Sequence, residues 1–290
     1  MKFLRRVSQG IFLTLFLFLF LQTESKGLDE LGYPVKIFLD FDPLILITTM
    51  LSAHTVQGFF YLSLVTILLT ILLGRVFCGW VCPLGTLNNI IGSLKRTESY
   101  KVRYWHRVKY YILIFLLTSS LLSLQFVGII DPLSLLIRSL SVSLYPQFNY
   151  GIRTIFDGIY SSNIKGLTDV SEAIYSLLKK TVLSFQQTFY QQSAFIGMLF
   201  LLVLGLNLIE KRFWCRYLCP LGALLGLLSR YSVLKRTVSE GCTSCGVCSK
   251  VCQGGADPDM KEEWKDYECY YCFNCDDICP KNAVNFVFFR

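Results

Sequence analysis

Twelve cysteines in three groups constrain this 290-residue chain more than any other feature. The last eight form two runs of the pattern C-x2-C-x2-C-x3-C, which begin at residues 242 and 269. Each run gathers four thiols on one short loop, which suits metal ligation better than a framework of disulfides. Zinc sites seldom use three cysteines at successive two-residue gaps, so the runs indicate iron–sulfur clusters.

The two runs have the spacing of bacterial two-cluster ferredoxins, a small α+β fold. In that pattern the fourth cysteine of each run binds the cluster of the other run. We therefore expect two 4Fe–4S clusters, one held by Cys242, Cys245, Cys248 and Cys279 and the other by Cys269, Cys272, Cys275 and Cys252. Pro280 follows the second run as usual, but Gln253 follows the first, so we expect a weaker turn there.

Long apolar segments indicate that the rest of the chain is an α-helical membrane protein. Only 17% of the residues are charged, against about 25% in soluble domains. The bases flank apolar segments and form no face with base-stacking aromatics, which argues against nucleic acid as a partner. Four segments approach the ~20 residues that cross a bilayer: Phe3–Gln22, about Val56–Leu73, about Tyr110–Ile130 and about Ser193–Leu208. We interpret the first as an uncleaved anchor, because no small-x-small cleavage site follows it.

The distribution of bases predicts the orientation. The N-terminus, residues 75–109 and residues 211–236 carry three, seven and six Lys or Arg. The 23–55 and 131–192 loops carry two and five. The positive-inside rule then places both termini and all twelve cysteines on the cytoplasmic side of a bacterial inner membrane.

An internal repeat organises the membrane part, predicted as residues 1–236 ahead of a ferredoxin domain at 237–290. The motif C-x3-C-P-L-G occurs at Cys78 and Cys82 and again at Cys215 and Cys219. An Asp-Pro-Leu motif precedes each, at Asp42 and Asp131. We expect two parallel helix pairs, the second with an external insertion over 131–192. A capping box at Asp169 and Glu172 predicts a helix inside that insertion.

The four cysteines of the repeated motif predict a third site. Residues four apart share a face of a helix, so each motif would present two thiols to one place. Four thiolates there would hold a third Fe–S cluster, bind a soft metal such as copper(I), or act as redox thiols. The pattern leaves these three interpretations open.

Together these motifs resemble the NapH/NosR-type membrane polyferredoxins over nearly the whole chain. The resemblance implies an electron-transfer subunit of a quinol dehydrogenase-type system, which takes electrons from membrane quinol and passes them through the 4Fe–4S clusters to a partner redox protein. Relatives with an external flavin domain carry an S/T-G-A-T attachment motif, which is missing here, so no covalent flavin is expected. A copper-handling or metalloenzyme-maturation reductase is the alternative function, and a redox-sensing membrane regulator is a third.

The two histidines argue against an intrinsic haem. His54 and His106 are predicted on opposite sides of the membrane, whereas a b-type haem needs two ligands at one depth. His106 with Trp105 and Tyr104 either lines a quinol site or anchors the chain at the interface. Asp42 and Asp131 either cap external turns or transfer protons.

Overall fold

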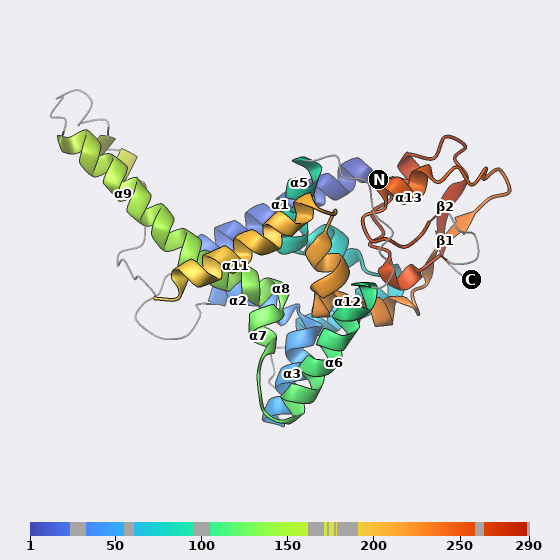
Figure 1. Ribbon diagram of the computed structural model, residues 1–290, viewed down its shortest axis with the longest axis horizontal. Coiled ribbons are helices and arrows are strands. Elements are labelled where there is room, and N and C mark those ends of the chain that lie inside the picture. Colours follow the sequence, from blue (N-terminus) through green and yellow to red (C-terminus); the bar gives the residue numbers. More distant parts are fainter. Residues whose placement is uncertain are drawn as a thin grey trace.

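The computed structural model describes residues 1–23, 33–54, 61–94, 105–161, 171–172, 174–176, 178, 191–258 and 264–288. It is mostly helical, as predicted, and carries a small two-stranded sheet near its C-terminus. The cysteine-rich tail lies at one end of the helices, and both chain termini lie at that same end (Figure 1).

The part predicted to lie in the membrane, residues 1–236, consists of helices and short helical turns. Its first half contains α1 (Lys2–Gln22), α2 (Tyr33–Asp40), α3 (Pro43–Ala53), α4 (Tyr61–Leu73), η1 (Phe77–Val81), α5 (Pro83–Leu94) and η2 (Trp105–Arg107). Its second half contains α6 (Val108–Leu121), α7 (Val127–Ile130), α8 (Pro132–Ser139), η3 (Leu140–Leu144), α9 (Tyr145–Ser161), α11 (Ser193–Gly205), η4 (Leu206–Leu208), η5 (Trp214–Leu218) and α12 (Pro220–Ser229). The tail contains β1 (Leu234–Val238), α13 (Val247–Val251), η6 (Asp266–Glu268), α14 (Asn274–Asp277) and β2 (Val284–Phe288).

Within the described ranges, α1 is the one helix that is both long and apolar enough to cross a membrane. The predicted span from Tyr110 to Ile130 is interrupted, because α6 ends at Leu121 and Ser123 adopts a left-handed φ of 62°. The predicted spans around α4 and α11 form shorter apolar helices. The number of four spans therefore stays a prediction.

Asp42 and Asp131 begin the corresponding helices α3 and α8. Each is followed by proline at the first helical position, where a missing N–H breaks no helical bond. Asp42 Oδ1 accepts from the backbone N–H of Leu44 at 2.8 Å, and Asp131 Oδ2 accepts from that of Ser134 at 2.9 Å. The two carboxyl groups also contact each other, and both are buried. These residues are thus helix caps in the core, where the two repeats meet, and not caps of exposed turns.

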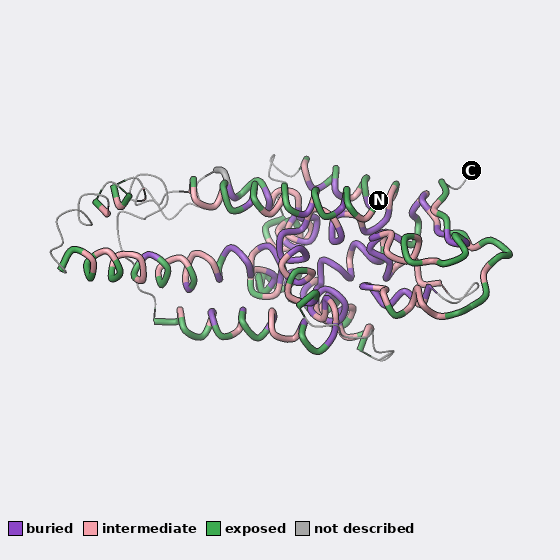
Figure 2. The backbone as a smooth tube through the Cα atoms, turned by 90° about the horizontal axis from the view of Figure 1, so that it is seen from above, coloured by how far each residue is buried: buried purple, intermediate pink, exposed green. Residues whose placement is uncertain are grey.

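The last helix of each repeat packs on the other repeat as well as on its own. The first repeat's α5 packs against α11 of the second, and the second repeat's α12 packs against α4 of the first. Leu84 and Leu221, the leucines of the two C-P-L-G motifs, are both buried in the shared core. Figure 2 shows buried residues concentrated where these helices meet the tail. These contacts between the repeats bring the two C-x3-C-P motifs close to each other.

The tail sheet pairs β1 with β2 in antiparallel register, from Leu234 opposite Phe288 to Val238 opposite Val284. The predicted domain boundary after residue 236 falls inside β1. The sheet thus joins the start of the tail to its end and closes the cysteine-rich loops between them.

Part of the predicted 131–192 insertion forms α9, which projects away from the tail (Figure 1). Asp169 of the predicted capping box lies outside the described residues, so that helix start remains a prediction.

Candidate iron–sulfur and thiol sites

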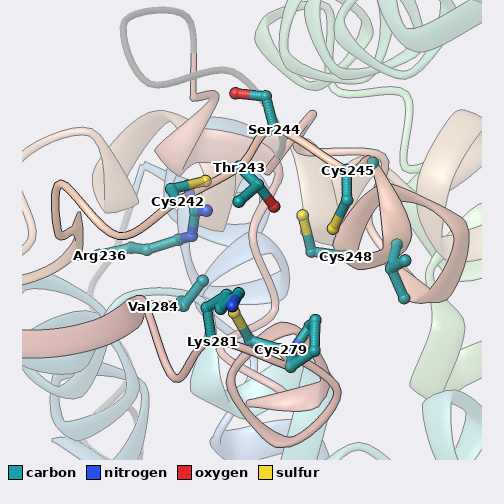
Figure 3. Close-up of a pocket in the computed structure, with 12 residues that line it drawn as sticks. Arg236, Cys242, Thr243, Ser244, Cys245, Cys248, Cys279, Lys281 and Val284 are labelled. Carbon is teal, nitrogen blue, oxygen red and sulfur yellow. The ribbon is translucent and has the colours of Figure 1, made fainter.

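Four tail cysteines line one pocket, together with Arg236 of β1 and Val284 of β2 (Figure 3). Three belong to the first run and the fourth belongs to the end of the second run: Cys242, Cys245, Cys248 and Cys279. The structure thus brings together the set predicted for the first cluster, including its member from the distant run.

The remaining tail cysteines form a second group: Cys252, Cys269, Cys272 and Cys275. Burial, followed by the neighbouring thiols of Cys272 and Cys252, raises the pKa of Cys269. Burial and the same two thiols raise the pKa of Cys275 to about 12. Cys252 therefore lies among the cysteines of the second run. A bound cation would offset the cost of ionising these crowded thiols.

The two runs share one backbone conformation. Ser244 and Tyr271, two places after the first cysteine of each run, have left-handed φ values of 51° and 47°. Two places further, Gly246 and Phe273 do the same, with φ values of 71° and 55°. Alternating left-handed residues turn successive backbone N–H groups toward one side, which favours a bound anion. The repeated conformation suits an anionic cluster–thiolate complex in each loop.

The turn after Cys252 has the same geometry as the turn after Cys279, contrary to the expectation from Gln253. The third residue after each cysteine has a left-handed φ, 68° after Cys252 and 47° after Cys279. The next backbone N–H, of Ala256 or Ala283, donates to the cysteine Sγ at 3.4 Å in both loops. The left-handed residue and the N–H···S bond define this turn, and proline is not required for it. The side chain of Gln253 instead donates to Asn89 Oδ1 at 2.8 Å and so ties the loop to α5.

The four cysteines of the repeated motifs are buried between the two repeats: Cys78, Cys82, Cys215 and Cys219. Burial, then the thiols of Cys215 and Cys78, raises the pKa of Cys82, and the same sequence of causes raises that of Cys219. The predicted convergence of both motifs on one place is thus present in the fold.

The two cysteines of one motif do not share an α-helical face, and that part of the prediction is wrong. Cys78 and Cys215 lie in the π-helical turns η1 and η5, whereas Cys82 and Cys219 have extended backbone. The cause is the following proline, which disfavours the α conformation in the residue before it. Cys82 and Cys219 lie instead at the N-termini of α5 and α12, and Cys219 Sγ accepts from the backbone N–H of Gly222 at 3.2 Å. The positive end of a helix dipole favours a thiolate there.

The glycine of each C-P-L-G motif allows a close approach. A Cβ on Gly85 would lie 2.8 Å from the carbonyl oxygen of Cys78. A Cβ on Gly222 would lie 2.8 Å from Arg75 Nη2 and 3.3 Å from the carbonyl oxygen of Cys215. Glycine therefore lets each helix start pack directly on its own cysteine turn.

Buried polar groups surround the site formed by Cys78, Cys82, Cys215 and Cys219, here called the four-cysteine site. The sequence analysis did not identify these polar groups. Asn88 Nδ2 donates to Cys215 Sγ at 3.4 Å and Asn207 Nδ2 donates to Asn88 Oδ1 at 2.8 Å, so a residue of each repeat supports the thiol. Arg75 and Arg212 are buried, and the Nε and Nη2 of both have no hydrogen-bond partner within the described residues. Buried guanidinium groups without hydrogen-bond partners are energetically costly unless a negative charge lies nearby. Four thiolates around a metal cluster fit that requirement.

A buried charge network joins the tail to the membrane part. Glu268, directly before Cys269, forms ion pairs with Lys109 and with Arg75, the latter at 3.3 Å. Tyr110 Oη donates to Glu268 Oε1 at 3.3 Å. His106 Nδ1 lies 3.8 Å from the same carboxylate. These contacts fix the second cysteine run against η1 and α6.

The aromatic residues near His106 have different environments. Trp105 is 52% exposed, whereas His106 is largely buried between Glu268 and the side chain of Arg216, whose Nε donates to His106 Nε2 at 3.3 Å. Tyr104 lies outside the described residues. Burial lowers the pKa of His106, and Glu268 opposes that shift.

No group of three or more His, Cys, Asp or Glu side chains in the described part of the chain is arranged to hold a single metal ion as it stands. In an iron–sulfur cluster the thiolates bind several irons, and the two tail sets and the four-cysteine site each supply the four thiols that a 4Fe–4S cluster needs.

A family model described as a 4Fe–4S binding domain matches residues 57–101 and 190–239, the segments that contain the two C-x3-C-P motifs. The putative electron transport protein YccM of Escherichia coli is 27% identical, over 74% of this chain and 51% of its own length. The ferredoxin-type protein NapH of Haemophilus influenzae is 25% identical, over 84% of this chain and 74% of its own. The regulatory protein NosR of Pseudomonas aeruginosa is 25% identical, over 86% of this chain and 28% of its own. No solved structure matches the chain.

The fold and these matches define an iron–sulfur protein of the ferredoxin type, with relatives in electron transport. The chain is similar to the NapH- and NosR-type polyferredoxins, in agreement with the resemblance seen in its motifs.

Proposed function

We propose that this protein transfers electrons from membrane quinol to a partner redox protein, with the cysteine sites as its redox centres. The observation that carries the proposal is the grouping of all twelve cysteines into three sets of four, two in the tail and one between the membrane repeats. A 4Fe–4S cluster bound by such a set supplies one-electron chemistry.

The third site is proposed to hold a cluster as well. The matched 4Fe–4S binding segments contain its four cysteines, and two buried arginines offer charge to an anion there. The helix starts of α5 and α12 and the side chain of Asn88 stabilise the thiolate form.

The quinol is proposed to react at the cytoplasmic face, near His106. This side chain is largely buried, with 13% of its surface exposed, and lies beside Glu268, which directly precedes Cys269. Loss of two electrons from a quinol releases two protons, which a site at this face can pass to water, while the clusters accept the electrons one at a time. The domain order, with the membrane part before a cytoplasmic ferredoxin domain, belongs to the same proposal.

Iron and acid-labile sulfide counting on the anaerobically purified protein tests the proposal. Three clusters give about twelve irons, and replacing Cys78 and Cys215 with serine lowers the count to about eight. Copper bound by the wild type and lost from the double variant would support the copper-handling alternative. A count of about eight irons in both the wild type and the double variant would contradict the third cluster.

A further inference from the structure

Arg75 and Arg212 hold the same position in the two repeats, three residues before the first cysteine of each motif. Both guanidinium groups lie over the ring of Tyr270, with their Cζ atoms 4.7 and 5.2 Å from its centroid. Tyr270 directly follows Cys269, and its carbonyl oxygen would lie 2.5 Å from a Cβ on Gly79. One aromatic ring of the tail is therefore packed against the arginines of both repeats.

The hydrogen bonds of these arginines orient them at the four-cysteine site. Arg212 Nη1 donates to the carbonyl oxygen of Cys78 at 3.0 Å. Arg75 Nη1 donates to the carbonyl oxygen of Tyr267 at 2.9 Å, and its Nη2 lies beside Gly222 at the start of α12. Each arginine thus uses one nitrogen for backbone contacts and keeps two others unpartnered within the described residues.

Around Tyr270 the buried cations outnumber the carboxylates before any metal is considered, although Asp131 also acts on Cys82 from the core. Glu268 pairs with Arg75, but it pairs with the buried Lys109 as well, so one carboxylate faces two cations. Arg212 adds a further positive charge within the same buried region. An excess of buried cations next to four thiols is unfavourable unless the thiols carry negative charge.

We propose that Arg75 and Arg212, oriented by Tyr270, are the buried counter-charges of the four-cysteine site and set its reduction potential. The inference rests on the proposed function, since it requires a cluster at that site. Reduction adds an electron to a complex that four thiolates already make negative, and nearby cations in a medium of low dielectric constant lower the cost. Removing either cation therefore lowers the potential.

The test is a redox titration of the full-length protein, followed by EPR, on wild type, Arg75→Gln, Arg212→Gln and Arg75→Lys. The signal of the four-cysteine site is the one that disappears in Cys215→Ser. Arg230→Gln is the matched control, because the guanidinium of Arg230 is exposed and lies over the ring of Tyr267, not over Tyr270. Tyr270→Phe keeps the ring, and Tyr270→Leu removes it.

We expect a tenfold or larger fall in the equilibrium constant for reduction, about 59 mV for one electron, in Arg212→Gln and Arg75→Gln. Arg75→Lys keeps the charge and shifts the potential less, Tyr270→Leu lowers it, and Arg230→Gln and Tyr270→Phe leave it unchanged. Should Arg75→Gln fail to fold because it also loses its bond to Glu268, Arg212→Gln carries the test. A site signal that titrates at the wild-type potential in Arg212→Gln overturns this inference alone. If no signal depends on Cys215, both the inference and the third cluster are overturned.

Discussion

Arg75 and Glu268 are both fully buried, lie 3.3 Å apart and connect the first C-x3-C-P repeat to the residue before Cys269. Lys109 pairs with the same carboxylate from α6. Taking such charges out of water is costly, and the network contributes little net stability over apolar packing. Its effect is positional, because it holds the second cysteine run in one place against the four-cysteine site.

Glu268→Gln should destabilise the protein by about 3–5 kcal/mol, because it leaves Lys109 and Arg75 buried without their carboxylate. Denaturant unfolding of the detergent-solubilised protein, followed by tryptophan fluorescence, measures the change. Asp277→Asn is the control, since the exposed Lys2–Asp277 pair should contribute at most about 1 kcal/mol. Equal losses in the two variants would contradict the buried network.

The stability of the protein should depend on pH through the same carboxylate. Burial alone would raise the pKa of Glu268, but Lys109, His106 and Arg75 outweigh it and hold that pKa at about 2. The unfolded value is about 4.3, so the contribution is complete above that pH and is lost as the pH falls toward 2. The melting temperature should therefore fall below about pH 4 more steeply in wild type than in Glu268→Gln. Parallel pH profiles would count against the network.

Replacing Cys279 with serine should damage the cluster held by Cys242, Cys245 and Cys248, while Cys252→Ser should damage the one held with Cys269. The basis is that each fourth cysteine lies with the thiols of the other run. EPR spectra of the two variants, reduced with dithionite, distinguish the two signals. If each variant loses the cluster of its own run, the crossed assignment is wrong.

Residue spacing predicted which three thiols share a loop, and the pattern of two-cluster ferredoxins predicted the fourth cysteine of each set from the other run. It predicted Asp42 and Asp131 as caps of external turns or proton carriers, whereas both cap buried helix starts, because Asp before Pro begins helices as well as turns. The mechanism within each C-x3-C-P motif was wrong, although Pro83 and Pro220 contained the signal that the preceding cysteine leaves the helix.

Other features depended on tertiary contacts that no local pattern contains. The partners of Glu268 and Tyr270 come from residues more than 150 positions away or from both repeats. Arg75 and Arg212 were detectable in principle, because they occupy equivalent positions in the repeat. The break after Leu121 was not, since the sequence there contains no proline or charge and only Ser123 and Gln125 as polar residues.

Reporter fusions test the predicted orientation. A fusion after Lys101 and one at the C-terminus should report the cytoplasm, and a fusion near Ser161, at the end of α9, should report the outside. The reason is the excess of Lys and Arg at the N-terminus and in residues 75–109 and 211–236, which carry the two C-x3-C-P motifs. An external C-terminus would reverse the predicted side of every cysteine.

The most direct test of the central claim is the EPR signal of the tail clusters after addition of a reduced quinol analogue. In wild type the quinol should reduce these clusters. In the Cys78→Ser, Cys215→Ser double variant the clusters should remain assembled and reducible by dithionite, but quinol should no longer reduce them. Normal quinol-driven reduction of the tail clusters in a variant that lacks all four thiols of the four-cysteine site would contradict the role of that site.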